Sequence, residues 1–150
     1  MKKFLFMFAL MICMLSIPMT GFAASTDAEK QQYEDAISEK WKEMLKGSIE
    51  LDQMNAENKA SLLAWLDSET KPEEAKRTVE KIRKLEAEQA KDQESMNPYL
   101  EAKKTCDEKL NADGANAALE NIIRIQKDRL EDQKELAKLW KKVMESLQVK

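Results

Sequence analysis

The last stretch of the chain, residues 115–148, constrains the fold most, because its apolar side chains return every three or four residues. At 3.6 residues per turn these side chains share one broad face of a helix, and charged side chains occupy the opposite face. The apolar face comprises Leu119, Ile122, Ile123, Leu130, Ala137, Trp140, Val143, Met144 and Leu147. A helix with such a wide apolar face must be buried by partners, so the segment predicts a helical core.

Two earlier segments have the same periodicity. The first spans about 27–68 and begins at Thr26, which forms a capping-box sequence with Glu29. The second starts at Pro72, a residue favoured in the first turn of a helix, and reaches about residue 110. No segment alternates apolar and polar residues with period two. We therefore predict an all-α protein, an elongated antiparallel bundle of three to four helices.

The number of helices depends on three weak points, near Gly47, Asn55 and Asn97. A break at any of them would divide a long helix, whereas a kink would leave three helices. The turn before the last helix is expected at residues 111–114, with Gly114 in the left-handed conformation that ends many helices.

The first 23 residues have the three parts of a secretory signal peptide. Two lysines precede an apolar run at residues 4–17, and Gly21 and Ala23 supply small residues for cleavage after Ala23. A helix of about 14 residues spans roughly 21 Å, less than the roughly 30 Å of a bilayer core. We expect a cleaved leader, residues 1–23, and one helical-bundle domain, residues 24–150, exported to the periplasm or secreted, with no stable membrane anchor.

Charge and residue types argue against several classes of function. The leader holds two of the 25 basic residues and none of the 28 acidic ones, so the remaining chain has a net charge of −5, unfavourable for binding nucleic acid. Histidine is absent, which excludes catalytic triads and imidazole ligands for zinc or haem. We expect no enzyme, no cofactor and no metal.

A partial calcium-loop pattern surrounds the last turn. Asn111, Asp113 and Glu120 have the spacing of EF-hand ligands, with Gly114 at the sixth position. The first ligand position would be Lys109, which cannot coordinate a cation. A simple turn between helices is the preferred interpretation.

Cys106 is the one cysteine left after the leader. It lies on the apolar side of its helix, which favours a buried thiol. The alternative is an intermolecular disulfide that links a homodimer.

Polar residues interrupt the apolar stripes near the middle of the chain's long helices. Folding the chain at its two turns places Gln93 level with Gln133, and both near Gly47 and Ser48. We predict a polar waist at mid-bundle whose buried groups must be hydrogen-bonded. Such a layer would fix the register of the helices or form a hydrated pocket or hinge.

The pattern points to an exported, non-enzymatic bundle that binds a protein partner or scaffolds an envelope assembly. Alternatives are a carrier of a small apolar ligand between the helices and a periplasmic chaperone-like stress protein. The candidate interaction residues lie at the margins of the apolar stripes, where a helix face can remain exposed: Ile49, Leu63, Ile125 and Leu139.

Overall fold

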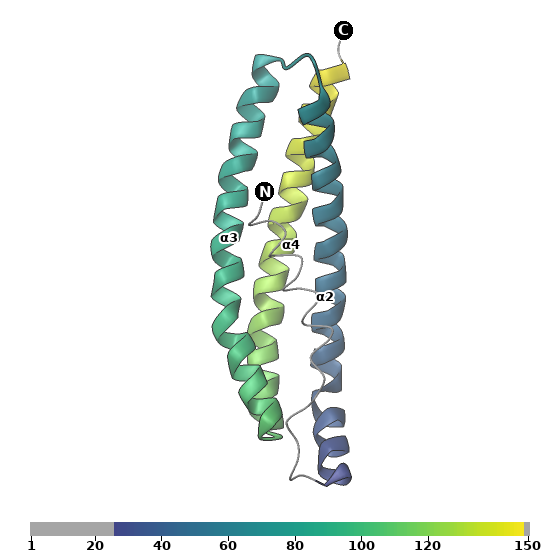
Figure 1. Ribbon diagram of the computed structural model, residues 1–150, viewed down its shortest axis with the longest axis vertical. Helices are drawn as coiled ribbons and strands as arrows, with labels where there is room; N and C mark the ends of the chain where they lie inside the picture. The colour runs from purple at the N-terminus through teal and green to yellow at the C-terminus, as the bar shows by residue number, and fades with distance from the viewer. Residues whose placement is uncertain (1–25, 149–150) are drawn as a thin grey trace.

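The computed structural model describes residues 26–148, which form three long helices. They are α2 (Asp27–Asp67), α3 (Glu73–Glu108) and α4 (Ala112–Gln148), each antiparallel to the one before it in the chain (Figure 1). The all-α prediction is confirmed for this part of the chain. The expected leader lies outside the described residues.

The helix boundaries follow local signals in the sequence. Thr26 caps α2: the Glu29 N–H donates to Thr26 Oγ1 at 3.3 Å, and the Thr26 N–H donates to Glu29 Oε2 at 2.9 Å. This is the predicted capping box. The chain leaves α2 at Ser68 and enters α3 after Pro72.

The three weak points do not break the helices. Both Gly47 and Asn55 lie inside α2, and Pro98 lies inside α3. Proline removes one backbone donor from a helix, and α3 bends in the part nearest its C-terminal end (Figure 1).

The turn between α3 and α4 differs from the prediction. Leu110, with φ of 52°, takes the left-handed conformation, and Gly114 lies in the first turn of α4. Asn111 begins α4 instead, because its Oδ1 accepts a hydrogen bond from the Gly114 N–H at 3.0 Å. The segment with the partial calcium-loop pattern is therefore mostly helix.

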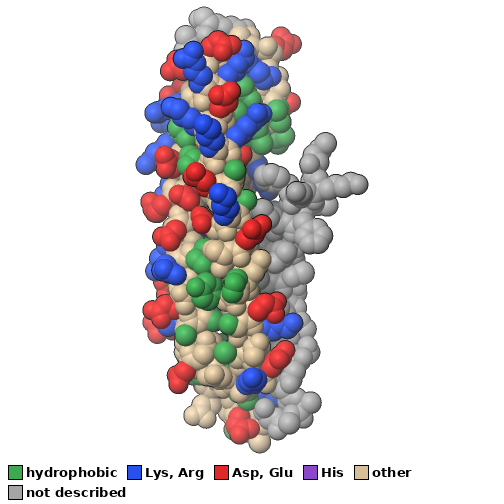
Figure 2. Space-filling model, turned by 90° about the vertical axis from the view of Figure 1, so that its left-hand side faces the viewer, with side chains coloured by type: hydrophobic (Ala, Val, Ile, Leu, Met, Phe, Trp, Pro, Cys, Tyr) green, Lys and Arg blue, Asp and Glu red, His purple; other side chains and the backbone are tan. Residues whose placement is uncertain are grey.

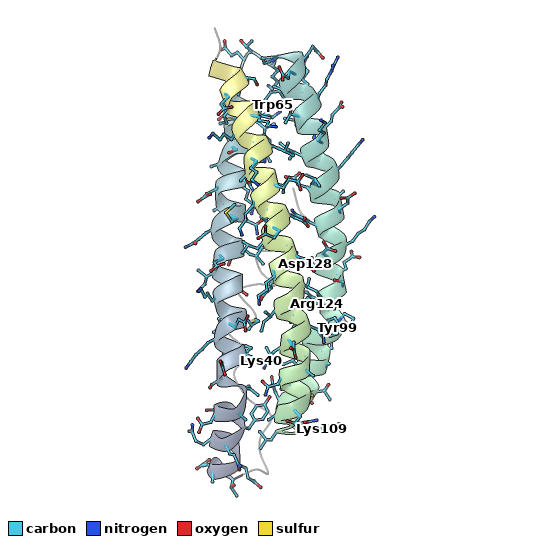
Figure 3. The ribbon with its side chains drawn as sticks, turned by 180° about the vertical axis from the view of Figure 1, so that it is seen from behind. Lys40, Trp65, Tyr99, Lys109, Arg124 and Asp128 are labelled. Atoms are coloured by element: carbon cyan, nitrogen blue, oxygen red, sulfur yellow. The ribbon has the colours of Figure 1, made fainter. Side chains whose placement is uncertain are left out.

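The central helix of the bundle is α4, which packs against both α2 and α3. No Cα atom of α2 comes within 8 Å of a Cα atom of α3. Seen from behind, α4 runs between its two neighbours, with Arg124 and Asp128 on its outward side (Figure 3). A helix with two partners must bury two flanks, which explains the wide apolar face of residues 115–148.

Buried positions repeat every seven residues, as in coiled coils. In α2 they are Ile37, Met44, Leu51, Asn58 and Trp65, and in α3 they are Ala75, Ile82, Gln89 and Met96. Apart from Leu51, the apolar members belong to two clusters. One joins the start of α2, the end of α3 and the start of α4, and the other joins the end of α2, the start of α3 and the end of α4.

Candidate functional site

Polar side chains separate the two apolar clusters. We call these seven residues the polar waist: Ser48, Asn58, Gln89, Gln93, Gln126, Arg129 and Gln133. Five of them are buried, and Ser48 and Gln93 are half-buried. Buried polar groups of this kind are costly unless they are hydrogen-bonded to one another.

Gln133 connects all three helices at one level. Its Oε1 accepts a hydrogen bond from Asn58 Nδ2 of α2 at 2.6 Å, and its Nε2 donates to Gln89 Oε1 of α3 at 2.6 Å. Asn58 Nδ2 also lies 3.2 Å from the main-chain oxygen of Gln133. One buried amide of α4 therefore sets the height of both flanking helices.

Gln93 lies about one turn of α4 away from the level of Gln133. Its Oε1 accepts a hydrogen bond from Nη1 of Arg129, and no hydrogen bond joins it to Gln133 in the described structure. The predicted pairing of Gln93 with Gln133 at a single level is therefore not what the helices adopt.

Arg129 is a buried cation in the middle of this layer. Only 3% of the residue is exposed, and no carboxylate lies within 4.0 Å of its guanidinium among residues 26–148. Burial lowers the pKa of Arg129, and the negative charges of Asp92, Asp52 and Asp132 act in the opposite direction. The Arg129 Nε atom has no hydrogen-bond partner.

Gln126 forms the third level of the waist. Ser48 Oγ donates to the Met44 carbonyl at 3.1 Å, so it can only accept from Gln126 Nε2, which lies 2.8 Å away. This arrangement directs Gln126 Oε1 toward Gly47, where it has no partner. A Cβ atom on Gly47 would lie 2.9 Å from this oxygen.

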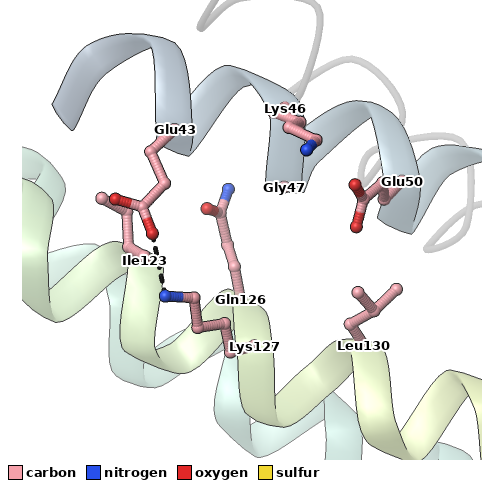
Figure 4. Close-up of a pocket in the computed structure, with 8 residues that line it drawn as sticks. All are labelled: Glu43, Lys46, Gly47, Glu50, Ile123, Gln126, Lys127 and Leu130. Atoms are coloured by element: carbon pink, nitrogen blue, oxygen red, sulfur yellow. Dashed lines mark hydrogen bonds and ion pairs between the residues drawn. The ribbon is translucent and has the colours of Figure 1, made fainter. Parts of the chain in front are cut away.

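A shallow cavity of about 180 Å³ lies beside this contact, between α2 and α4 (Figure 4). Charged side chains surround its opening, and Lys127 Nζ bonds Glu43 Oε1 at 2.8 Å across it. The apolar part of its lining comes from Ile123 and Leu130. Its open, charged rim distinguishes it from an enclosed site for an apolar ligand.

A second polar network joins α2 directly to α3 near the start of α2. The Tyr33 hydroxyl donates to Asp107 Oδ1, and Lys103 Nζ lies 2.6 Å from Asp107 Oδ2. The same ammonium lies 4.4 Å from the ring centroid of Trp41. Burial raises the pKa of Tyr33, and the adjacent Asp107 raises it further. The sequence pattern places Tyr33 and Trp41 on a core stripe but does not identify their charged partners on another helix.

Cys106 lies against the first turn of α4. Its thiol is half-buried, and a Cβ atom on Gly114 would lie 2.6 Å from its Sγ atom. The thiol therefore fills space that glycine leaves open. Because Cys106 is half-buried, the buried thiol and the disulfide-linked homodimer both stay predictions.

The four candidate interaction residues fall into two groups. Ile49 and Leu63 of α2 are 59% and 60% exposed. Ile125 is 9% exposed within one apolar cluster, and Leu139 packs against the other. The expectation that Ile125 and Leu139 are exposed is wrong, because α4 packs against two helices and buries the margins of its stripe.

Within residues 26–148, no group of three or more cysteine, aspartate or glutamate side chains could hold a metal ion, and no helix is long and apolar enough to cross a membrane. Basic and acidic side chains are interspersed over the face shown in Figure 2. No family model matches the chain, and comparisons with curated proteins and with solved structures also gave no match.

Proposed function

We propose that this chain is an exported, non-enzymatic helical bundle that binds a protein partner or scaffolds an envelope assembly. The observation that carries the proposal is the exposure of Ile49 and Leu63 on the outer side of α2, together with Leu66, which is 55% exposed. These are the large apolar side chains that the described bundle leaves most open. Large apolar side chains left exposed on the outer side of one helix are a surface that a protein partner could cover.

The other two candidate functions have less support. The two buried tryptophans, Trp65 and Trp140, pack within an apolar cluster, whereas the carrier hypothesis requires a cavity between them. The chaperone hypothesis requires a concave apolar surface, and the exposed apolar residues of α2 lie on a convex helix face. Partner binding through α2 needs neither feature.

The test uses the full chain with its leader, expressed in its own cells. A photocrosslinking amino acid at Gln53, between the two apolar residues, should capture a partner, and Ile49→Asp/Leu63→Asp should abolish the capture. Ala90→Asp, at an exposed position of α3, is the matched control. Capture of the same partner at the same level by the double variant would overturn the proposal.

Export is tested in the same sample. The mass of the protein recovered outside the cytoplasm should correspond to a chain that begins at Ala24, because the small residues Gly21 and Ala23 favour cleavage there. Recovery of the full-length chain only inside the cytoplasm would contradict export without affecting the crosslinking result.

A further inference from the structure

The outer side of α2 carries a second seven-residue repeat. Ile49, Ala56 and Leu63 recur every seven residues, and Gln53 and Ala60 lie between them, which gives alternating steps of four and three. All five positions are exposed. This outer seam lies nearly opposite the buried series of Leu51, Asn58 and Trp65. Steps of four and three are the spacing with which one helix packs along another.

The outer seam is nearly symmetric about Ala56, with a large apolar residue seven positions away on either side. When a second α2 helix is laid antiparallel with its Ala56 against the first Ala56, Ile49 of each copy meets Leu63 of the other. Gln53 meets Ala60 in the same register. The small alanine side chains at the centre let the two backbones approach closely.

The charges beside the seam favour the antiparallel orientation. On one flank, Asp52 of each copy lies opposite Lys59 of the other, an attractive pair that occurs twice. In a parallel pair Asp52 would instead lie opposite Glu57, a repulsive pair that also occurs twice. Leu66 extends the same flank and would lie opposite Leu45, which is half-buried.

We propose that a second copy of this chain docks antiparallel on the outer side of α2, with the twofold axis at Ala56. The inference rests on the proposed function, because it names the partner of the same apolar surface. On the opposite flank Glu57 of each copy lies beside Glu57 of the other, close to the twofold axis, and this repulsion makes the dimer weak. Its affinity should therefore respond to single charge changes.

Disulfide trapping tests the register and orientation. All variants lack residues 1–23, which contain Cys13, and carry Cys106→Ser, so no native thiol remains. Ala56→Cys should link to itself on oxidation, because the residue lies on the axis. Gln53→Cys and Ala60→Cys should link when the two variants are mixed, and neither should link efficiently alone. Self-linking by Gln53→Cys would indicate a parallel pair and overturn the proposal.

Sedimentation equilibrium of the protein without its leader tests the energetics. We expect Ile49→Asp/Leu63→Asp to weaken dimerisation by at least about tenfold, and Glu57→Gln to strengthen it by about two- to fivefold by removing the repulsive pair near the axis. Ala90→Asp should leave the dimer unchanged. Circular dichroism should show unchanged helix content in each variant.

The outcomes separate this inference from the proposed function. A protein that is monomeric at every concentration, but whose capture of a different partner is abolished by Ile49→Asp/Leu63→Asp, would overturn the dimer and leave partner binding standing. If Ile49→Asp/Leu63→Asp still dimerises and still captures its partner, both the dimer and partner binding through this surface are overturned.

Discussion

Gln126 occupies the space that a side chain on Gly47 would need. The buried amide of Gln126 donates to Ser48 at 2.8 Å, and its oxygen would lie 2.9 Å from a Cβ atom on Gly47. A glycine in a helix interior costs about 1 kcal/mol relative to alanine. In α2 this cost is offset by the room that the glycine leaves for a polar side chain from α4.

Replacing Gly47 with alanine tests this relationship. In an open helix position the change should stabilise the protein by about 1 kcal/mol. Here we expect no gain or a loss, because the new methyl group displaces the Gln126 amide from Ser48. The same substitution in a Gln126→Ala background should recover the gain. Urea unfolding of the four proteins measures the coupling, and equal effects in both backgrounds would contradict the contact.

Leucine substitutions test the purpose of the polar waist. Gln133→Leu alone should destabilise the protein by about 1–3 kcal/mol, because it leaves the buried amides of Asn58 and Gln89 without their partner. Replacing all three with leucine should instead raise the melting temperature, since an apolar layer carries no desolvation cost.

In the triple variant the helices should also no longer be held in a single axial alignment, as happens in coiled coils that lack their buried polar residue. Broadened side-chain NMR signals would report this loss. A lower melting temperature in the triple variant than in Gln133→Leu would indicate that the amides stabilise the bundle outright.

Gly114 and Cys106 form a second close contact that can be tested. Gly114→Ala should destabilise the protein, because the added Cβ atom would lie 2.6 Å from Cys106 Sγ. Cys106→Ala should relieve this clash and recover part of the lost stability in the double variant, because the added Cβ atom would still lie 2.9 Å from Asn111 Nδ2. The measurement is thermal unfolding under reducing conditions. If Cys106 also links two chains, the wild type should migrate as a dimer on non-reducing electrophoresis, whereas a thiol held against Gly114 should leave it monomeric.

Glu86 should make stability depend on pH. Burial raises the pKa of this half-buried carboxyl above 4.5, and Arg83 opposes the shift. The folded state thus binds this proton more tightly than the unfolded state, and the stability it contributes is lost as pH rises through the raised pKa. Glu86→Gln should melt higher than wild type at neutral pH, with a difference that disappears below about pH 4.5.

The matched control for this effect is Glu80→Gln, at an exposed position of α3. This substitution also removes one negative charge, but the charge it removes is exposed to solvent. A pH-independent difference between Glu86→Gln and wild type would contradict the assignment to burial.

Local signals in the sequence predict the helices well. Thr26 with Glu29 and the Pro72 boundary act within a few residues, so they fix where α2 begins and where α3 follows. The periodicity also identifies residues 115–148 as the segment with the widest apolar face. The polar waist is visible as an interruption of these stripes.

Contacts between helices are harder to predict, because they depend on how the turns set one helix against another. The left-handed residue is Leu110, and this turn places Gln93 beside Arg129 instead of level with Gln133. Ile125 looks marginal on a single helix, yet it is buried because α4 has two neighbours. Hydrogen bonds between side chains that are 44 or 75 positions apart in the sequence cannot be recognised from the local residue pattern.

Because α4 alone packs closely against both other helices, the order of synthesis matters for this chain. The ribosome completes α2 and α3 before α4 exists, and the backbones of those two helices do not approach each other. Their seven-residue stripes therefore have no full partner until the last segment has been made, and the bonds that close the bundle span 75 and 78 residues. The apolar core is therefore completed only once the residues of α4 have been made.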